Sequence, residues 1–193
     1  MSFKNLAKKL KTPKAVQQFL RTLAYNREED GETVRSALFA LKKRKAHCFE
    51  ATFIAAAILE HHGYPSLVVS IESQDNLDHV IYVFKKNGLW GSIARSRDDG
   101  LHGRPPKYRS IRDLVRSYVE PFIDKTGRIT GYQLANLDDT GTDWRFSKRN
   151  LWKAEKYLVD IPHITFSSSD TKYKKLHQSY LESGPMKRKA SWW

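Results

Sequence analysis

The segment from Cys48 to His62 constrains the fold more than any other part of the chain, because it predicts a helix with apolar residues on most sides. Phe53 and Leu59 are two of its large apolar residues. A helix that is hydrophobic nearly all round is usually buried in a core. Gly63 and Pro65 follow, as is typical just beyond the end of a helix. The rest of the 193 residues must therefore surround a central helix, and this length suits one domain.

The N-terminal region predicts further helices. Thr12 is a good N-cap and Pro13 suits the first helical position. Apolar residues then recur at helical spacing between Val16 and Leu23. A second helix is expected from about Glu32, ending in the basic run of residues 42–45, since cations suit a helix C-terminus.

The middle of the chain predicts strands. Residues 67–71 are short and β-branched, and residues 79–84 alternate and are rich in Val, Ile and Tyr. Asn87-Gly88 is a strong hairpin signal, and residues 89–94 would form the returning strand. This order indicates an α+β domain in which N-terminal helices and the Cys48 helix pack on an antiparallel sheet.

The remainder gives weaker signals. Residues 96–108 predict a polar loop and residues 110–118 a helix, while residues 124–144 resist assignment. Residues 152–159 suit a helix or a strand, and residues 164–166 suit a strand. The expected organisation is a single domain over residues 1–184, followed by a basic, flexible tail over residues 185–193.

The net charge of +13 favours attraction to anionic partners, so nucleic acid or another polyanion is a candidate partner. There is no zinc-finger spacing, RNP-like run or Gly-rich phosphate loop, and the sequence predicts no cofactor and no metal. No apolar run approaches the ~18–20 residues of a membrane helix. Residues 1–14 lack the apolar core of a secretory signal, so a cytoplasmic location without membrane association is expected.

Cys48 is the single cysteine, and two interpretations stay open. A free Cys is often a small buried hydrophobe. It is instead a candidate nucleophile when a distant histidine can pair with it. Cys48 lies at a predicted helix start, where backbone N–H groups lower a thiol pKa and can hold an oxyanion. His79 begins a strand, which would hold its ring rigidly as general base and acid.

The pattern resembles the transglutaminase-like superfamily, which shares the papain-like arrangement, and in particular a poorly characterised bacterial branch. The resemblance spans about half the chain, roughly residues 25–118. The segments that carry it are residues 47–53, 55–59, 62–65, 78–84 and 88–92, with further likeness at residues 31–33 and 108–114.

The resemblance implies a Cys nucleophile, a His base and an Asp on the following strand. Cys48 and His79 match the first two positions. Where the family places its acid, this chain has Ser92, followed by Ala94 and Ser96. We expect Ser92 to orient the His79 ring; the loop could instead supply a carboxylate from Asp78, Asp98 or Asp99. Tyr25 and Asn26 lie where some relatives keep a side chain near the oxyanion.

Two functions follow from this. The first is an enzyme that carries out thiol-dependent acyl transfer, or hydrolysis of an amide, on a peptide, protein or small amide substrate. The second is a non-catalytic module of the same fold that binds an anionic partner. The missing acid and the high charge favour the second function, whereas the pairing of Cys48 with His79 favours the first.

Overall fold

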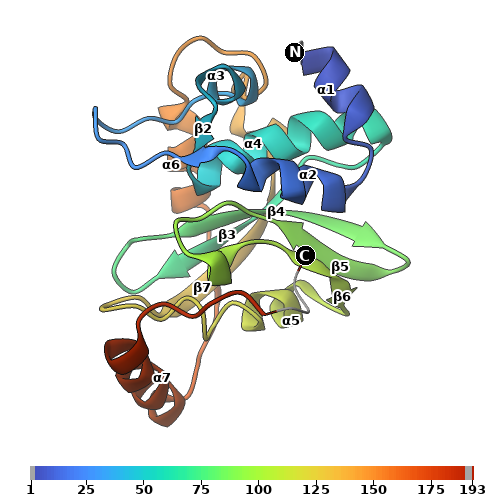
Figure 1. The fold of residues 1–193 in the computed structure, drawn as a ribbon. Helices are drawn as coiled ribbons and strands as arrows, with labels where there is room; N and C mark the ends of the chain where they lie inside the picture. Colours follow the sequence, from blue (N-terminus) through green and yellow to red (C-terminus); the bar gives the residue numbers. More distant parts are fainter. Residues whose placement is uncertain (1–2, 190–192) are drawn as a thin grey trace.

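The computed structural model describes residues 3–189 and 193, and it is a mixed α+β structure in which helices cover both faces of an antiparallel sheet (Figure 1). The six strands of this sheet follow the order β6-β5-β4-β3-β7-β8. Two short strands, β1 and β2, pair in parallel beside the helical layer. The expected combination of helices with an antiparallel sheet is confirmed.

The elements have the following bounds. The helices are α1 Phe3–Lys9, α2 Pro13–Arg21, α3 Ala37–Lys43, α4 Cys48–Leu59, α5 Ile111–Arg116, α6 Trp152–Asp160 and α7 Asp170–Ser183, with 3-10 turns η1 Glu60–His62, η2 Asp99–Leu101 and η3 Leu137–Thr140. The strands are β1 Ala24–Tyr25, β2 Lys45–Ala46, β3 Leu67–Ser73, β4 His79–Lys86, β5 Leu89–Ile93, β6 Arg104–Tyr108, β7 Ile129–Asn136 and β8 Ile164–Thr165. Across the described residues, none of these helices combines the length and apolar character that crossing a bilayer requires.

Helix α4 lies in the centre of the helical layer, as its apolar sequence predicts. Every residue from Phe49 to Leu59 is buried, and the helix packs on β4, α2 and α3. Alternate residues of β4 serve two cores. Val80, Tyr82 and Phe84 face the α4 side, whereas Ile81 and Val83 face the α5 side. Because both faces of β4 are covered, its sequence is an almost continuous apolar run.

The β4–β5 hairpin forms at the predicted turn. Asn87 and Gly88 have φ values of 51° and 77°, the left-handed conformations that a two-residue turn with matching twist requires. Lys86 pairs with Leu89 on either side of the turn. The turn therefore fixes the register of β5 against β4, and with it the position of each β5 side chain.

Three sequence expectations about local structure were wrong or incomplete. The second helix begins at Ala37, not near Glu32, because residues 26–35 are held in an extended loop by Glu50. The expected loop of residues 96–108 contains η2 and the edge strand β6, whose two prolines have no backbone N–H to present at the sheet edge. Strand β7 lies between β3 and β8, although its polar, glycine-containing sequence gave no clear strand signal.

The C-terminal segment makes contacts where it is described. Lys189 lies 3.6 Å from a carboxylate oxygen of Glu120. The Trp193 ring stacks on Phe84 with ring centroids 5.7 Å apart. The expectation of a flexible tail covers residues 185–193, of which residues 190–192 lie outside the described part.

Candidate active site

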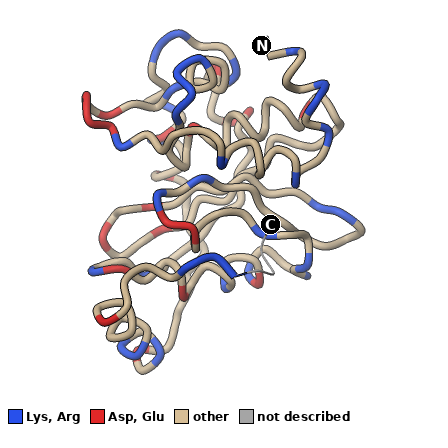
Figure 2. The backbone as a smooth tube through the Cα atoms, in the orientation of Figure 1, with Lys and Arg blue, Asp and Glu red and all other residues tan. Residues whose placement is uncertain are grey.

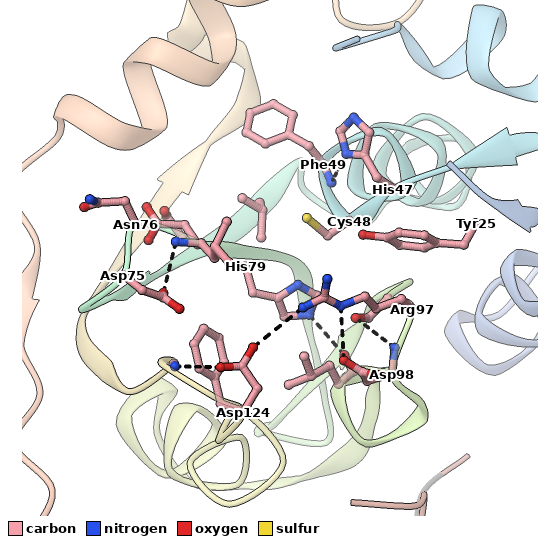
Figure 3. Close-up of a pocket in the computed structure, with 18 of the residues that line it drawn as sticks. Tyr25, His47, Cys48, Phe49, Asp75, Asn76, His79, Arg97, Asp98 and Asp124 are labelled. Carbon is pink, nitrogen blue, oxygen red and sulfur yellow. Dashed lines mark hydrogen bonds and ion pairs between the residues drawn. The ribbon is translucent and has the colours of Figure 1, made fainter. Parts of the chain in front are cut away.

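A cleft of about 530 Å³ contains both Cys48 and His79 (Figure 3). Its walls come from the start of α4, from α6, and from the loops that follow β3 and β5. Figure 3 shows the Cys48 sulfur between the His47 ring and Tyr25, with His79 facing it from the sheet. Two residues 31 positions apart in sequence, the candidate nucleophile and the candidate base, thus line one cavity.

Cys48 is the first residue of α4 and is half-buried. The first turn of a helix has backbone N–H groups without intrahelical acceptors, and their dipoles favour an anion there. The sulfur is therefore placed where a thiolate is stabilised, while part of it stays in contact with the cleft.

His79 is the first residue of β4, and its ring is held by a backbone carbonyl. Its Nε2 lies 3.0 Å from the Leu101 carbonyl oxygen, at the end of η2. A carbonyl only accepts, so Nε2 carries the proton and donates it. The other nitrogen, Nδ1, is then free to interact with the Cys48 sulfur, which the ring faces in the cleft (Figure 3).

The environment of Cys48 favours the thiolate. Burial on its own would raise the pKa of the thiol, but the neighbouring His47 and His79 rings hold it well below its usual value. Two imidazoles and a helix start thus act together on one sulfur. Such a thiol would be a nucleophile at neutral pH, where a free thiol is mostly protonated.

His47 is the N-cap of α4 and has a structural task beside its effect on Cys48. Its Nδ1 accepts the Phe49 backbone N–H at 3.2 Å, and its Nε2 lies 2.7 Å from the Thr33 carbonyl oxygen. Burial lowers the pKa of His47, but its hydrogen bond to Cys48 and the charges of Cys48 and Glu50 raise it to about 9. The two roles of His47 therefore alternate: the ring caps α4 while Nδ1 is unprotonated, and it stabilises the thiolate by its charge once Nδ1 takes a proton.

Glu50 holds the cleft wall together from inside. Its carboxylate is fully buried and forms an ion pair of 2.6 Å with Arg35 Nε. It also accepts the backbone N–H groups of Arg35 and His47, and the side chains of Asn26 and Thr33. A single carboxylate thus ties the loop of residues 26–35 to the helix start that carries Cys48.

Ser92 lies away from His79, contrary to its expected role. Its hydroxyl is 2.7 Å from the Tyr118 hydroxyl and accepts the Arg104 backbone N–H at 3.0 Å. In the sheet Ser92 pairs with Val83, four residues along β4 from His79, which is a separation of about 13 Å. The group that holds the His79 ring is the Leu101 carbonyl instead.

The three alternative carboxylates are also engaged elsewhere. Asp78 lines the cleft but accepts the Ser73 backbone N–H at 2.8 Å. Asp98 lies 3.4 Å from Arg97 Nε, and Asp99 is 69% exposed at 3.8 Å from His102. Burial, ahead of other causes, raises the pKa of Asp78. Within the described residues, none of the three has a hydrogen bond to His79.

Tyr25 and Asn26, adjacent in the sequence, have different environments. Asn26 is buried and its amide donates to Thr33 and Glu50, so its role is structural. The Tyr25 ring lies in the cleft with its hydroxyl directed toward Cys48 (Figure 3). Burial, and then the negative charge on Cys48, raise the pKa of Tyr25, so its hydroxyl stays protonated and available as a donor.

Sequence reasoning did not identify Leu101, Glu50 or Arg35 as parts of this site. A backbone carbonyl has no side-chain signature, so Leu101 could not have been found. Glu50 had a usable signal, because it lies three residues after the cap His47 and completes a capping box. In the part of the chain that the structure describes, no three His, Cys, Asp or Glu side chains gather closely enough to hold a metal ion.

No protein-family model matches this chain, and no curated protein sequence matches it either.

Proposed function

We propose that the protein is a thiol-dependent acyltransferase or amide hydrolase with Cys48 as nucleophile and His79 as general base and acid. One observation carries the proposal: the His79 ring faces the Cys48 sulfur in one cleft and is held from its other side by a fixed acceptor, the Leu101 carbonyl. Nucleophile, base and orienting group are the three parts that this chemistry requires.

The reaction would proceed in two stages. The Cys48 thiolate attacks the substrate carbonyl carbon, and its electron pair forms the C–S bond while the carbonyl becomes an oxyanion. The oxyanion collapses and expels the amine, which takes the proton held on His79 Nδ1, leaving a thioester. Water or a second amine then loses a proton to His79 and attacks the thioester. Collapse of that intermediate releases the product and the Cys48 thiolate, and His79 keeps the proton that it took from the water or amine, which restores the starting pair.

The Leu101 carbonyl would act as the third member. It fixes the tautomer of His79, as an Asp or Asn would, because it accepts from Nε2. It is neutral, however, and stabilises an imidazolium less than a carboxylate does. The proposal therefore implies slower turnover than that of a centre with a buried acid.

Tyr25 would be the side-chain donor to the oxyanion. Its hydroxyl is directed toward Cys48 and stays protonated in the presence of the thiolate. A hydroxyl placed before the reaction where charge develops stabilises the transition state without reorganisation. The backbone N–H groups at the start of α4 would share this role.

A relation to the transglutaminase-like superfamily is part of the same proposal. What supports it is the placement of the cysteine at the start of a buried helix and of the histidine on the first residue of a strand packed against that helix. The reaction and substrate do not follow from such a relation alone, because related folds carry different chemistry.

Acylation by p-nitrophenyl acetate tests the proposal, since this activated ester needs no specific substrate pocket. We expect a burst of p-nitrophenol equal to the protein concentration, and an acetyl group on Cys48 by mass spectrometry. Cys48→Ala should abolish both, while His79→Ala should slow acylation by about 100-fold. The proposal would be refuted if Cys48 carried no acetyl group and the lysines were acetylated no faster than they are in the unfolded protein.

A second candidate function is binding of an anionic partner without catalysis. The net charge of +13 favours it, and Figure 2 shows Lys and Arg distributed over the whole fold. This function predicts retention on a heparin column at low salt and release as salt rises. Elution in the void volume at low salt would eliminate it.

A further inference from the structure

The cleft has a charge opposite to that of the protein. The chain carries 34 Lys and Arg against 21 Asp and Glu. The residues that line the cleft nevertheless include seven Asp or Glu and one Arg or Lys, which is Arg97. A chain with an excess of 13 positive charges thus surrounds its reacting sulfur with carboxylates.

Arg97 does not neutralise this cleft, because its charge is already shared. Its guanidinium lies 3.4 Å from Asp98 and 3.6 Å from Asp124, both of which line the cleft. Figure 3 shows Arg97 at the level of His79, with Asp98 and Asp124 below it. The remaining carboxylates are left with no Lys or Arg of the cleft to pair with.

On the helical side of the cleft three glutamates gather near Cys48. Glu28 accepts the Thr33 backbone N–H at 2.7 Å and lies 3.7 Å from His47 Nε2. Glu32 is exposed on the same loop, and Glu155 is half-buried on α6. Within residues 3–189 and 193, no ion pair joins Glu32 or Glu155 to a Lys or Arg.

These carboxylates act on one another. Burial raises the pKa of Glu155, the charge of His47 lowers it, and the charges of Glu32, Glu28 and Cys48 raise it again. Like charges held in a partly buried cleft repel one another, and a cation placed among them relieves this repulsion. His47 offsets part of this repulsion, and a bound cationic group would relieve more of it.

We propose that Glu32 and Glu155 form a subsite for a substrate ammonium or guanidinium group, so that the enzyme acts on amides next to Lys or Arg side chains. This inference rests on the proposed function, since it names the substrate class of the Cys48–His79 centre. An acidic cleft attracts cations and repels anions. This raises the association rate of a cationic substrate as well as its affinity. It also places the substrate cation a short distance from the reacting carbonyl, where it would help to orient the scissile bond.

Charged thiol reagents test the inference without a known substrate, because the chain has a single cysteine. The probes are three methanethiosulfonates that carry a trimethylammonium, a methyl or a sulfonate group. In each reaction the thiolate attacks the sulfenyl sulfur, a disulfide forms and methanesulfinate leaves. At one pH both reagents meet the same fraction of thiolate. The ratio of the labelling rate of the cationic reagent to that of the anionic reagent therefore reports only the electrostatic potential in the cleft.

Relative to free cysteine in the same buffer, we expect Cys48 to favour the cationic over the anionic reagent by about tenfold or more at low ionic strength. Glu32→Gln with Glu155→Gln should lower this ratio by about three- to tenfold. The matched control, Asp139→Asn with Glu182→Gln, removes two exposed charges that do not line the cleft, and should leave the ratio within about twofold.

The outcomes separate the two proposals. Fast reaction with the neutral reagent together with a ratio equal to that of free cysteine would overturn the cationic subsite and leave the Cys–His centre standing. A ratio that falls equally in the control pair would also overturn the subsite. No reaction with any reagent would overturn both, because a thiol that small molecules cannot reach serves no substrate.

Protection by a substrate-like amide provides a second measurement. Nα-acetyl-lysine N-methylamide should slow labelling by the neutral reagent, whereas the norleucine analogue, which has a similar side chain without the charge, should not. The protection should be lost in the Glu32→Gln, Glu155→Gln variant. Equal protection by both compounds would show that the cleft recognises the amide alone, and would contradict the subsite.

Discussion

Replacing His79 with alanine should reduce the rate at which iodoacetamide labels Cys48 at pH 6 by about 10- to 100-fold, because the thiolate loses one of its two imidazole partners. Only the thiolate reacts, so the rate at pH 6 follows the thiolate fraction. The loss should shrink toward pH 9, where an ordinary thiol also ionises. His47 and the helix start remain in the variant, and they set the residual reactivity.

A matched control is His61→Ala, since His61 is exposed and its ring bonds the Ala57 carbonyl outside the cleft. This variant should label at the wild-type rate at every pH. Both proteins should have wild-type circular dichroism spectra, so that a folding defect is not mistaken for a change in thiol pKa. Undiminished labelling of His79→Ala at pH 6 would contradict a role for His79 in holding the thiolate.

Replacing Glu50 with glutamine should lower the free energy of unfolding by about 3–5 kcal/mol, because it breaks a buried ion pair and leaves the Arg35 charge uncompensated. The amide also presents N–H groups where the carboxylate accepted from the Arg35 and His47 backbone. Equilibrium urea denaturation measures the effect as a lower midpoint at an unchanged slope.

Glu182→Gln is the control for Glu50, since Glu182 is exposed on α7 and should change stability by about 0.5 kcal/mol or less. The paired variant Glu50→Leu, Arg35→Met removes both buried charges and should recover much of the lost stability. It should not recover Cys48 reactivity, because the loop of residues 26–35 would lose its tie to the helix start. If Glu50→Gln lowered the free energy of unfolding by less than about 1 kcal/mol, the carboxylate would not link the loop of residues 26–35 to the start of α4 as described.

The sequence was sufficient to predict the features that depend on local pattern. The apolar circumference of α4 predicted its burial, and Asn87-Gly88 predicted the hairpin that fixes β5. Cys48 and His79 could be expected to face one cleft because Cys48 begins a helix and His79 begins a strand. Side chains at such positions lie at the edge of the packed helix and sheet layers. Each of these signals is carried by a few neighbouring residues.

The features that depend on long-range contacts could not be predicted. Strand β7 is polar and contains Gly131, so only its pairing with β3 identifies it. The sequence suggested Ser92 as the partner of His79 because it lies on the strand that follows His79 in the chain. The strand register, however, pairs Ser92 with Val83. Continuing the same register would bring Ser96, not Ser92, level with His79. Leu101 contributes a carbonyl, which every residue has, so only the fold selects it.

The central claim is that a helix start and two imidazoles keep the lone sulfur ionised, and titration of the thiolate by its ultraviolet absorbance tests it most directly. Cys48→Ala provides the baseline to subtract. The account predicts thiolate absorbance that is already complete at neutral pH and lost as acid is added, below the range of an ordinary thiol. A transition near the unperturbed thiol value of about 8.5 in the folded protein, matching that of the unfolded chain, would contradict it.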